Sequence, residues 1–499
     1  MENKMFCNQC QETFHNQGCI INGVCGKSSA VSNLMDELIE KLKILVQDDS
    51  VNRQKGFFIA QSLFMTITNT NFDMERIKNQ IDKANKLIEK NHSSVMPKNS
   101  EENDLNLRSI KDLLLYTIKG IAAYTYHASI LGYEDDDIYE FFYTALRSIT
   151  QKKSPDKLIS LVMEAGNYAV KAMELLDEAN CATYGNPQIT TVRTDVNSRP
   201  GILVSGHDLR DLEELLEQTL YSGIDIYTHG EMLAAHYYPE LKKYSHLYGN
   251  YGNSWYLQYK EFALFNGPIL ITSNCITPIQ PSYEDRIFTT SVAGYEGIKH
   301  IPDRTEGKAK DFSEIIKLAK KSRPPVKLED GKIIGGFAHN QLFNLSDKII
   351  SAIKAKKIKH FIVMAGCDGR AKSREYYTKV AQNLPDGTVI LTAGCAKYRY
   401  NKLKLTPIDD IPRVIDAGQC NDSFSLALFA LKLKEDLSLK DVNELPISFD
   451  IAWYEQKAVA ILVALLSLGF KNIKIGPTFP AFLSPDILQF LNKTFGLTK

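Results

Sequence analysis

The sequence predicts a multidomain protein in which an N-terminal helical bundle is followed by two α/β domains with largely parallel central sheets. Helical periodicity dominates the chain up to about residue 180. From Gly201 onward, short apolar segments alternate with amphipathic helices, which is typical of α/β domains. The length of 499 residues also exceeds that of one ordinary domain, so the chain is long enough for several hydrophobic cores.

The helical domain is predicted from apolar residues that recur at intervals of three and four. The pattern is clearest in residues 30–46, 105–131 and 155–179. The polar stretch 91–104 is predicted to be a loop between helices. Residues 185–200 are rich in turn-forming and β-forming residues and have no helical face, so they mark a domain boundary. The first domain is therefore predicted to span residues 1–190.

The α/β half is predicted to contain two domains, residues 191–338 and 339–499. The boundary between them is placed near residues 332–339, after the polar, proline-bearing stretch 320–331. Short apolar runs flanked by turn residues identify the strands. The predicted strands are residues 201–205, 224–228, 269–272, 332–337, 360–364, 389–392, 413–416, 447–451 and 472–475.

Charge and hydropathy exclude several classes of protein. Lysine plus arginine equals aspartate plus glutamate at 59 each, so the basic footprint of a nucleic-acid-coating protein is absent. The longest apolar run, residues 458–470, is well short of the roughly 20 residues that span a bilayer, and is predicted to be a buried helix. The start MENKM has no apolar signal-peptide core. We therefore expect a cytoplasmic protein without membrane insertion, whose nine cysteines are reduced thiols or metal ligands.

Four cysteines near the N-terminus form the densest chemical motif of the chain. Cys7, Cys10, Cys19 and Cys25 have the spacing C-x2-C-x8-C-x5-C. Four thiolates this close match an iron–sulfur cubane, in which each iron takes one cysteine. Zinc is the main alternative, because four-cysteine zinc sites also open with C-x2-C. A disulfide-stapled arm is the third, and it is disfavoured because disulfides belong to secreted chains.

Seven further residues of metal-binding type occur at equivalent positions in the α/β half. Each follows a predicted strand, and several begin an evident helix. Because open α/β sheets place their sites at the carboxyl ends of strands, these side chains are expected to converge in one crevice. Thiolates suit sulfide-bridged iron, whereas carboxylate and imidazole suit oxygen-bridged iron, so a shared metal site is predicted. The seven are His207, Glu231, Cys275, Cys367, Cys395, Cys420 and Glu455.

Four other residues near these motifs receive different interpretations. Cys181 has no cysteine neighbour and is predicted to be structural. His229 and His236 flank Glu231, and a supporting or surface role is favoured over ligation. Lys457 is a weak candidate for a proton donor, with a surface lysine at a helix start as the alternative.

Several phrases of the chain closely resemble the hybrid cluster proteins, also called prismane proteins or hydroxylamine reductases. The resemblance extends over nearly the whole chain. The spacing of the first four cysteines resembles the branch of that family with an N-terminal [4Fe–4S] cluster. The matching phrases include residues 6–26, 205–214 (SGHDLRDLEE), 227–238 (YTHGEMLAAHYY), 364–373 (MAGCDGRAKS), 392–402 (TAGCAKYRYNK), 416–423 (DAGQCNDS) and 452–459 (AWYEQKAV).

This resemblance implies a three-domain fold with two iron centres. It assigns the [4Fe–4S] cluster to the four N-terminal cysteines. It assigns a hybrid [4Fe–2S–2O] cluster to the seven strand-end residues, and in Cys367 it implies the cysteine that can carry a persulfide. An electron-donor protein, either a reductase or ferredoxin-like, is the implied partner.

The implied activity is the two-electron reduction of hydroxylamine to ammonia and water. Two alternatives stay open at this stage. Nitric oxide reduced to nitrous oxide in defence against nitrosative stress is the first. A non-catalytic redox sensor or thiol-nitrosylating protein is the second. The sequence does not choose among them, because all three use the same cluster.

Overall fold

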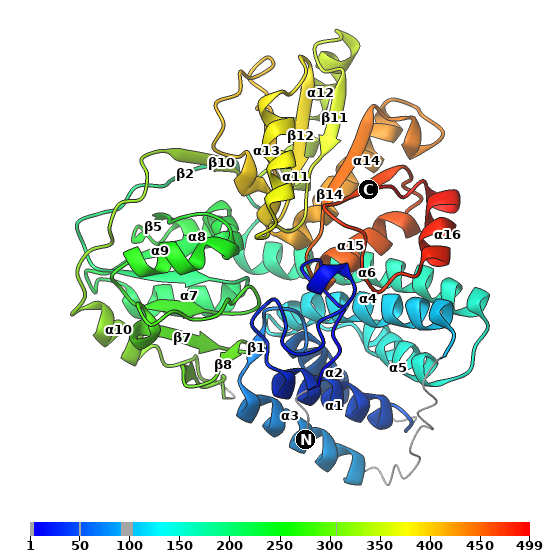
Figure 1. The fold of residues 1–499 in the computed structure, drawn as a ribbon. Helices are drawn as coiled ribbons and strands as arrows, with labels where there is room; N and C mark the ends of the chain where they lie inside the picture. The colour runs from blue at the N-terminus through cyan, green and yellow to red at the C-terminus, as the bar shows by residue number, and fades with distance from the viewer. Residues whose placement is uncertain (1–3, 49–50, 91–102, 306) are drawn as a thin grey trace.

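The structure, a computed structural model, describes residues 4–48, 51–90, 103–305 and 307–499 (Figure 1). The N-terminal third is helical, as predicted, with one two-residue strand, β1 (Asn71–Phe72). Polar side chains begin several helices; for example, Asp104 accepts hydrogen bonds from the first amides of α4. Most of the predicted loop 91–104 lies outside the described residues. The helices are α1 (Ser29–Leu45), α2 (Arg53–Met65), α3 (Met74–Lys90), α4 (Leu105–Ser129), α5 (Asp136–Thr150) and α6 (Pro155–Tyr184).

The first α/β region is built on a six-stranded sheet in which all strand pairs are parallel. Its order is β5-β4-β3-β6-β7-β9. Helices α7 (Leu209–Thr219), α8 (Pro239–Lys242), α9 (Gln258–Leu264) and α10 (Ser313–Ala319) accompany it. The strands are β3 (Gly201–Ser205), β4 (Asp225–His229), β5 (Leu247–Asn250), β6 (Ile269–Ile271), β7 (Ile287–Thr290) and β9 (Lys299–Ile301). The predicted strands at β3, β4 and β6 are confirmed, whereas β5, β7 and β9 were not predicted.

The second α/β region has a five-stranded parallel sheet in the order β13-β12-β11-β14-β15. All five of its strands were predicted. They are β11 (His360–Val363), β12 (Thr388–Thr392), β13 (Val414–Asp416), β14 (Ile447–Ala452) and β15 (Ile473–Gly476). Its helices are α11 (His339–Asn344), α12 (Ser346–Lys354), α13 (Glu375–Gln382), α14 (Ser423–Asp436), α15 (Gln456–Ser467) and α16 (Pro485–Phe495).

The two predicted domain boundaries are joined to each other. Strand β2 (Thr190–Arg193) lies in the first boundary and pairs antiparallel with β10 (Lys332–Gly335) at the second. The predicted strand 332–337 therefore exists, but in this two-stranded ribbon and not in a central sheet. Residues 185–200 were predicted as a domain boundary rich in β-forming residues, but no strand was predicted there, so β2 was missed. The division into domains 1–190, 191–338 and 339–499 stays a prediction.

Helix α15 connects the last region to the helical bundle by packing against α4 and α6. Two glycines permit the close approach. A Cβ atom on Gly120 would lie 2.6 Å from the carbonyl oxygen of Gln456, and one on Gly166 would lie 2.5 Å from that of Val463. The predicted buried helix at residues 458–470 is thus confirmed as the core of α15, whose side chains are buried on nearly every face. In Figure 1, the N-terminal loop (dark blue) lies in front of this junction.

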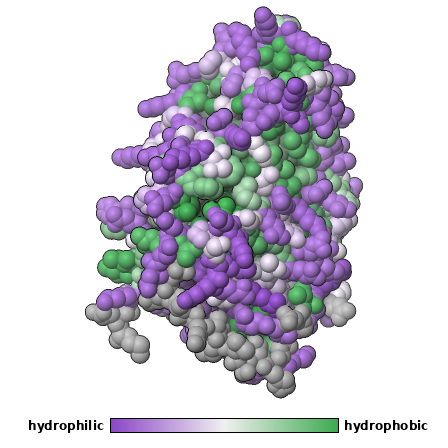
Figure 2. Space-filling view, turned by 90° about the vertical axis from the view of Figure 1, so that its right-hand side faces the viewer, coloured by the Kyte–Doolittle hydropathy of each residue, from purple (hydrophilic) through white to green (hydrophobic). Residues whose placement is uncertain are grey.

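Within the described parts of the chain, no helix has the length and apolar character needed to cross a membrane. Figure 2 shows one face of the molecule covered mainly by hydrophilic side chains, with apolar ones gathered across its middle.

Candidate metal centres

The N-terminal loop brings its four cysteines together through backbone pairing. The amide of Cys7 donates to the carbonyl of Cys19 (3.0 Å), and the amide of Cys19 donates back to Cys7 (2.8 Å). Two donors also point at the sulfurs: the Phe14 amide lies 3.5 Å from Cys19 Sγ, and Lys27 Nζ lies 3.5 Å from Cys7 Sγ. Hydrogen bonds to cysteine sulfur are one means by which proteins tune iron–sulfur clusters.

The four thiols influence one another but do not fit around one metal ion. Burial, together with Cys25 and Cys7, raises the pKa of Cys10. No three of the four sulfurs lie all within 4.8 Å of one another. A tetrahedral zinc site with Zn–S bonds near 2.3 Å would hold its sulfurs about 3.8 Å apart. The spacing therefore fits a group larger than a single zinc ion. All nine cysteines are free thiols, which contradicts the alternative of a disulfide-stapled arm.

The seven strand-end residues follow the carboxyl ends of strands, as predicted. Three follow neighbouring strands of the first sheet and four follow neighbouring strands of the second. Glu231, Cys395 and Cys420 lie in the short helices η2 (Gly230–Tyr237), η6 (Cys395–Arg399) and η7 (Cys420–Asp422). Glu455 is the N-cap of α15. In strand order, β4, β3 and β6 lead to Glu231, His207 and Cys275, and β13, β12, β11 and β14 lead to Cys420, Cys395, Cys367 and Glu455.

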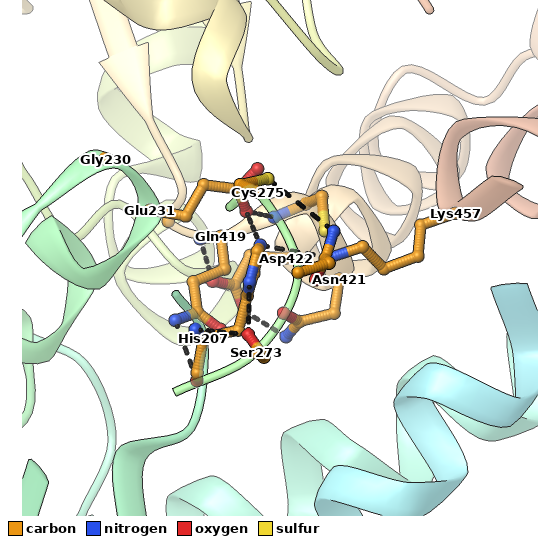
Figure 3. A network of polar contacts seen from close by, with 12 residues as sticks. His207, Gly230, Glu231, Ser273, Cys275, Gln419, Asn421, Asp422 and Lys457 are labelled. Atoms are coloured by element: carbon orange, nitrogen blue, oxygen red, sulfur yellow. Dashed lines mark hydrogen bonds and ion pairs between the residues drawn. The ribbon is translucent and has the colours of Figure 1, made fainter. Parts of the chain in front are cut away.

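The two sheets meet at this site. His207 Nε2 lies 3.2 Å from Glu231 Oε2, and the amide of Cys420 donates to the same oxygen (2.7 Å). His207, Glu231 and Cys420 are the one set of three or more such residues in the described chain whose ligand atoms all lie within 4.8 Å. Figure 3 shows His207 and Glu231 of the first α/β region close to Gln419 and Lys457 of the second.

Ser273 orients the imidazole of His207. Its Oγ accepts from the His207 amide (2.9 Å) and lies 3.0 Å from His207 Nδ1, which leaves Nε2 facing the centre. Gln419 Nε2 donates to the carbonyl of His207 (3.2 Å). Such support on the far ring nitrogen is usual for a histidine that binds metal.

Burial sets the charge state of the acidic groups. It raises the pKa of the four cysteine thiols of the strand-end site. For Cys367 the pKa rises to about 12, and the nearby Glu455 carboxylate is a further cause. Burial also raises the pKa of Glu455. For Glu231 burial acts in the same direction, but His207, Lys457 and the Cys420 amide together outweigh it and lower the pKa. Deprotonating all of these donors requires a compensating positive charge, which is what a metal group supplies. The donor set of sulfur, nitrogen and oxygen fits iron bridged by both sulfide and oxygen.

Lys457 lies inside the site, so the alternative of a surface lysine is wrong. Its side chain is 2% exposed. Nζ lies 3.0 Å from His207 Nε2, donates to Asn274 Oδ1 (3.0 Å) and lies 3.8 Å from Glu455 Oε1. Burial lowers the pKa of Lys457, but Cys420, Glu455 and other acidic neighbours more than reverse this. Sequence reasoning missed Asn274 and Ser273, whose only signal is their position directly before Cys275.

One short segment connects the two cysteine sites. The amide of Gln11 donates to Tyr454 O (2.9 Å), and Gln456 Nε2 donates to Gln9 O (2.5 Å). Glu455 lies between Tyr454 and Gln456, and Lys457 follows directly. Both belong to the strand-end site. Consecutive residues of the β14–α15 junction therefore face the N-terminal loop and the second site in alternation.

Arg374 makes a second connection from η5 (Lys372–Arg374). Its guanidinium donates to Gln11 Oε1 (2.9 Å), Trp453 O (2.7 Å) and Cys367 O (3.2 Å). The side chain has no exposed surface. One buried cation thus holds the N-terminal loop, the β14–α15 junction and the loop of Cys367 together.

The remaining sequence candidates lie outside the site. Cys181 is on α6, where burial raises its pKa to about 12, and its structural role stays a prediction. His229 and His236 are both buried, so neither is a surface residue. His229 lies between Ser205 Oγ (3.1 Å) and Glu261 Oε2 (2.9 Å), and His236 Nε2 lies 3.0 Å from Thr228 Oγ1.

The sequence profile described as the Prismane/CO dehydrogenase family matches residues 5–499. The chain belongs to this family. The resemblance of the chain to this family, expected from its sequence, is thereby confirmed. Two of its most similar relatives are proteins named hydroxylamine reductase, from Chlorobaculum tepidum and Caldanaerobacter subterraneus. Each is 54% identical over 99% of this chain and 97% of the relative.

Two solved structures show the same fold at low identity. A carbon monoxide dehydrogenase from Thermococcus sp. AM4 has a TM-score of 0.59 at 15% identity, covering 98% of this chain and 87% of that one. A chain from an acetyl-CoA synthase/carbon monoxide dehydrogenase structure has a TM-score of 0.57 at 14% identity, covering 98% of this chain and 84% of that one. These matches confirm the multidomain α and α/β fold class.

Proposed function

We propose that this chain is a hydroxylamine reductase, an oxidoreductase that reduces hydroxylamine to ammonia and water. The observation that carries the proposal is the convergence of His207, Glu231 and Cys420 from two sheets onto one buried centre. Full-length relatives at 54% identity that bear the name hydroxylamine reductase support the same reaction. Those names favour hydroxylamine over the alternatives of nitric oxide reduction and non-catalytic sensing.

We further propose which residues hold the two clusters. A [4Fe–4S] cluster would bind Cys7, Cys10, Cys19 and Cys25, and the sulfur spacing that exceeds a single zinc site supports this. A hybrid [4Fe–2S–2O] cluster would bind the seven strand-end residues, whose mixed donor set supports it. The seven are His207, Glu231, Cys275, Cys367, Cys395, Cys420 and Glu455.

The reaction consumes two electrons and two protons for each N–O bond broken. When bound, the hybrid cluster supplies the electrons and an open iron that acts as a Lewis acid. The protein supplies a buried site. At one end of this site, His207, Glu231 and Glu455 offer nitrogen and oxygen atoms, whereas the cysteines offer sulfur. Lys457 Nζ, held by Asn274 at this end, is the candidate donor of a proton to the departing oxygen.

Electrons would arrive from a reductase or ferredoxin-like protein at the N-terminal loop. Cys7 is half-buried, whereas the other three cysteines of the loop are buried, so the loop approaches the surface at Cys7. Gln9, Gln11 and Arg374 then connect this loop to the strand-end site.

Anaerobic metal analysis and steady-state assays test the proposal together. Two four-iron clusters imply about eight irons per chain. Reduced enzyme should form ammonia from hydroxylamine, at a higher kcat/KM than for forming nitrous oxide from nitric oxide. Stoichiometric zinc, or only four irons per chain, would contradict the two-cluster assignment. Turnover of nitric oxide but not of hydroxylamine would contradict the proposal that hydroxylamine is the substrate.

A further inference from the structure

His127, near the end of α4, is buried without a hydrogen-bond partner. Among the described residues it is the one buried histidine for which neither ring nitrogen has a partner in the protein. Other buried histidines, such as His236 and His246, bond a threonine hydroxyl at 3.0 Å. The imidazole of His127 is held by ring contacts, edge-on to Phe64 with centroids 5.2 Å apart.

This ring lies beside the strand-end site. The centroids of the His127 and His207 imidazoles are 6.4 Å apart, with their planes inclined by 32°. Tyr124 is three residues earlier and so lies on the same face of α4. Its hydroxyl donates to Cys420 Sγ at 3.7 Å. Helix α4 therefore presents a tyrosine to the sulfur side of the site and an unpartnered histidine to the His207 side.

A buried polar group without a partner destabilises a fold, and a phenylalanine of nearly the same shape would avoid this cost. A histidine at this position therefore implies a partner that is not part of the chain. The ring nitrogens of an imidazole can donate or accept a hydrogen bond.

We propose that His127 binds the substrate, forming a hydrogen bond to hydroxylamine on the His207 side of the site. Hydroxylamine carries N–H and O–H donors and lone pairs on both heavy atoms, so either ring nitrogen of His127 finds a complementary group. The inference rests on the proposed function and adds to it a residue that recognises the substrate. It assigns His127 no role in holding iron.

The test compares the holoenzyme with its His127→Phe and His127→Gln variants. Hydroxylamine is titrated into oxidised enzyme without a reductant, and the half-saturating concentration is read from the change in the cluster's EPR signal. We expect His127→Phe to raise this concentration, and the KM of turnover, about tenfold, which corresponds to about 1.4 kcal/mol. His127→Gln, which keeps a donor and an acceptor, should stay within about threefold of wild type. Iron content should not change.

Thermal unfolding separates binding from packing. His127→Phe should melt at the wild-type temperature or above it, because it removes an unpartnered polar group. His246→Phe is the matched control, and it should melt lower because it removes an existing side-chain hydrogen bond, the one between His246 Nε2 and the Thr219 hydroxyl.

Three results would overturn the inference. An unchanged half-saturating concentration in His127→Phe is the first, a melting temperature lowered as far as in His246→Phe is the second, and loss of iron is the third. Wild-type enzyme that neither binds nor reduces hydroxylamine would refute the proposed function as well, so the two failures are distinguishable.

Discussion

Replacing Arg374 with methionine should separate three segments that one buried guanidinium now joins. The substitution keeps most of the apolar stem but removes the donors to Gln11 Oε1, Trp453 O and Cys367 O. A hydrogen bond from a charged donor contributes about 1.5 kcal/mol at the low end, so three lost bonds cost about 5 kcal/mol. For a chain of this length the unfolding entropy is about 1 kcal/mol per kelvin, which predicts a melting temperature about 5 °C lower.

Arg370 provides a matched control four residues away. It also bonds the N-terminal loop, through Glu12 (2.7 Å), but its side chain is 39% exposed. Because solvent reaches and screens the Arg370 guanidinium, and the Arg370 amide still donates to Glu12 Oε1 (2.7 Å), Arg370→Met should cost about 1 kcal/mol and about 1 °C. Anaerobic thermal unfolding of both holoproteins is the assay. Equal shifts in the two variants would show that burial of the Arg374 bonds does not set their contribution.

Three further predictions concern single residues. Cys181→Ser should leave iron content and EPR spectra unchanged, and loss of either cluster signal would show that a ligand was misplaced. Glu455→Gln keeps the cap on the Lys457 amide but removes the carboxylate that we propose binds iron. It should lower hydroxylamine turnover at least about tenfold with an altered hybrid-cluster spectrum, and normal turnover would reduce Glu455 to a helix cap. His236→Gln should reduce the loss of native-state stability at acidic pH. Burial lowers the pKa of His236 to about 4, so between about 6.5 and 4 only the unfolded chain is protonated and the native state loses stability as pH falls. The loss is about 2 kcal/mol at pH 5, and melting temperatures at pH 7.5 and 5.0 should show a smaller drop in His236→Gln than in the exposed-site control His15→Gln.

The strand-end site could be predicted because its logic is local in sequence. A parallel sheet brings the carboxyl ends of its strands to one edge, so a ligand-type residue after each apolar run is placed by chain order alone. Cys395 after residues 388–392 and Cys420 after residues 414–416 follow this rule. The assignment of these residues as iron ligands is still a prediction.

Features that depend on distant partners could not be predicted in this way. Strand β2 forms by pairing with β10, more than 130 residues away, and its own segment indicated only a domain boundary. Strand β9 has only three residues, and its pairing with β7 decides its conformation. On α15 every face is buried, so helical periodicity gave no sign that Lys457 points inward. A lone histidine such as His127, in an apolar helix, reads as core until its missing partners are seen.

The contacts of the N-terminal loop bear on the order in which the molecule is made. Cys7 to Cys25 are synthesised long before Gln456, yet Gln9 is fixed by Gln456, which lies 447 residues later in the chain. Gln11 likewise bonds Arg374 and Tyr454, which are also synthesised much later. These cysteines therefore acquire their final surroundings only after the last α/β region has been made and has docked. Stable filling of the proposed N-terminal cluster site should in consequence follow that docking.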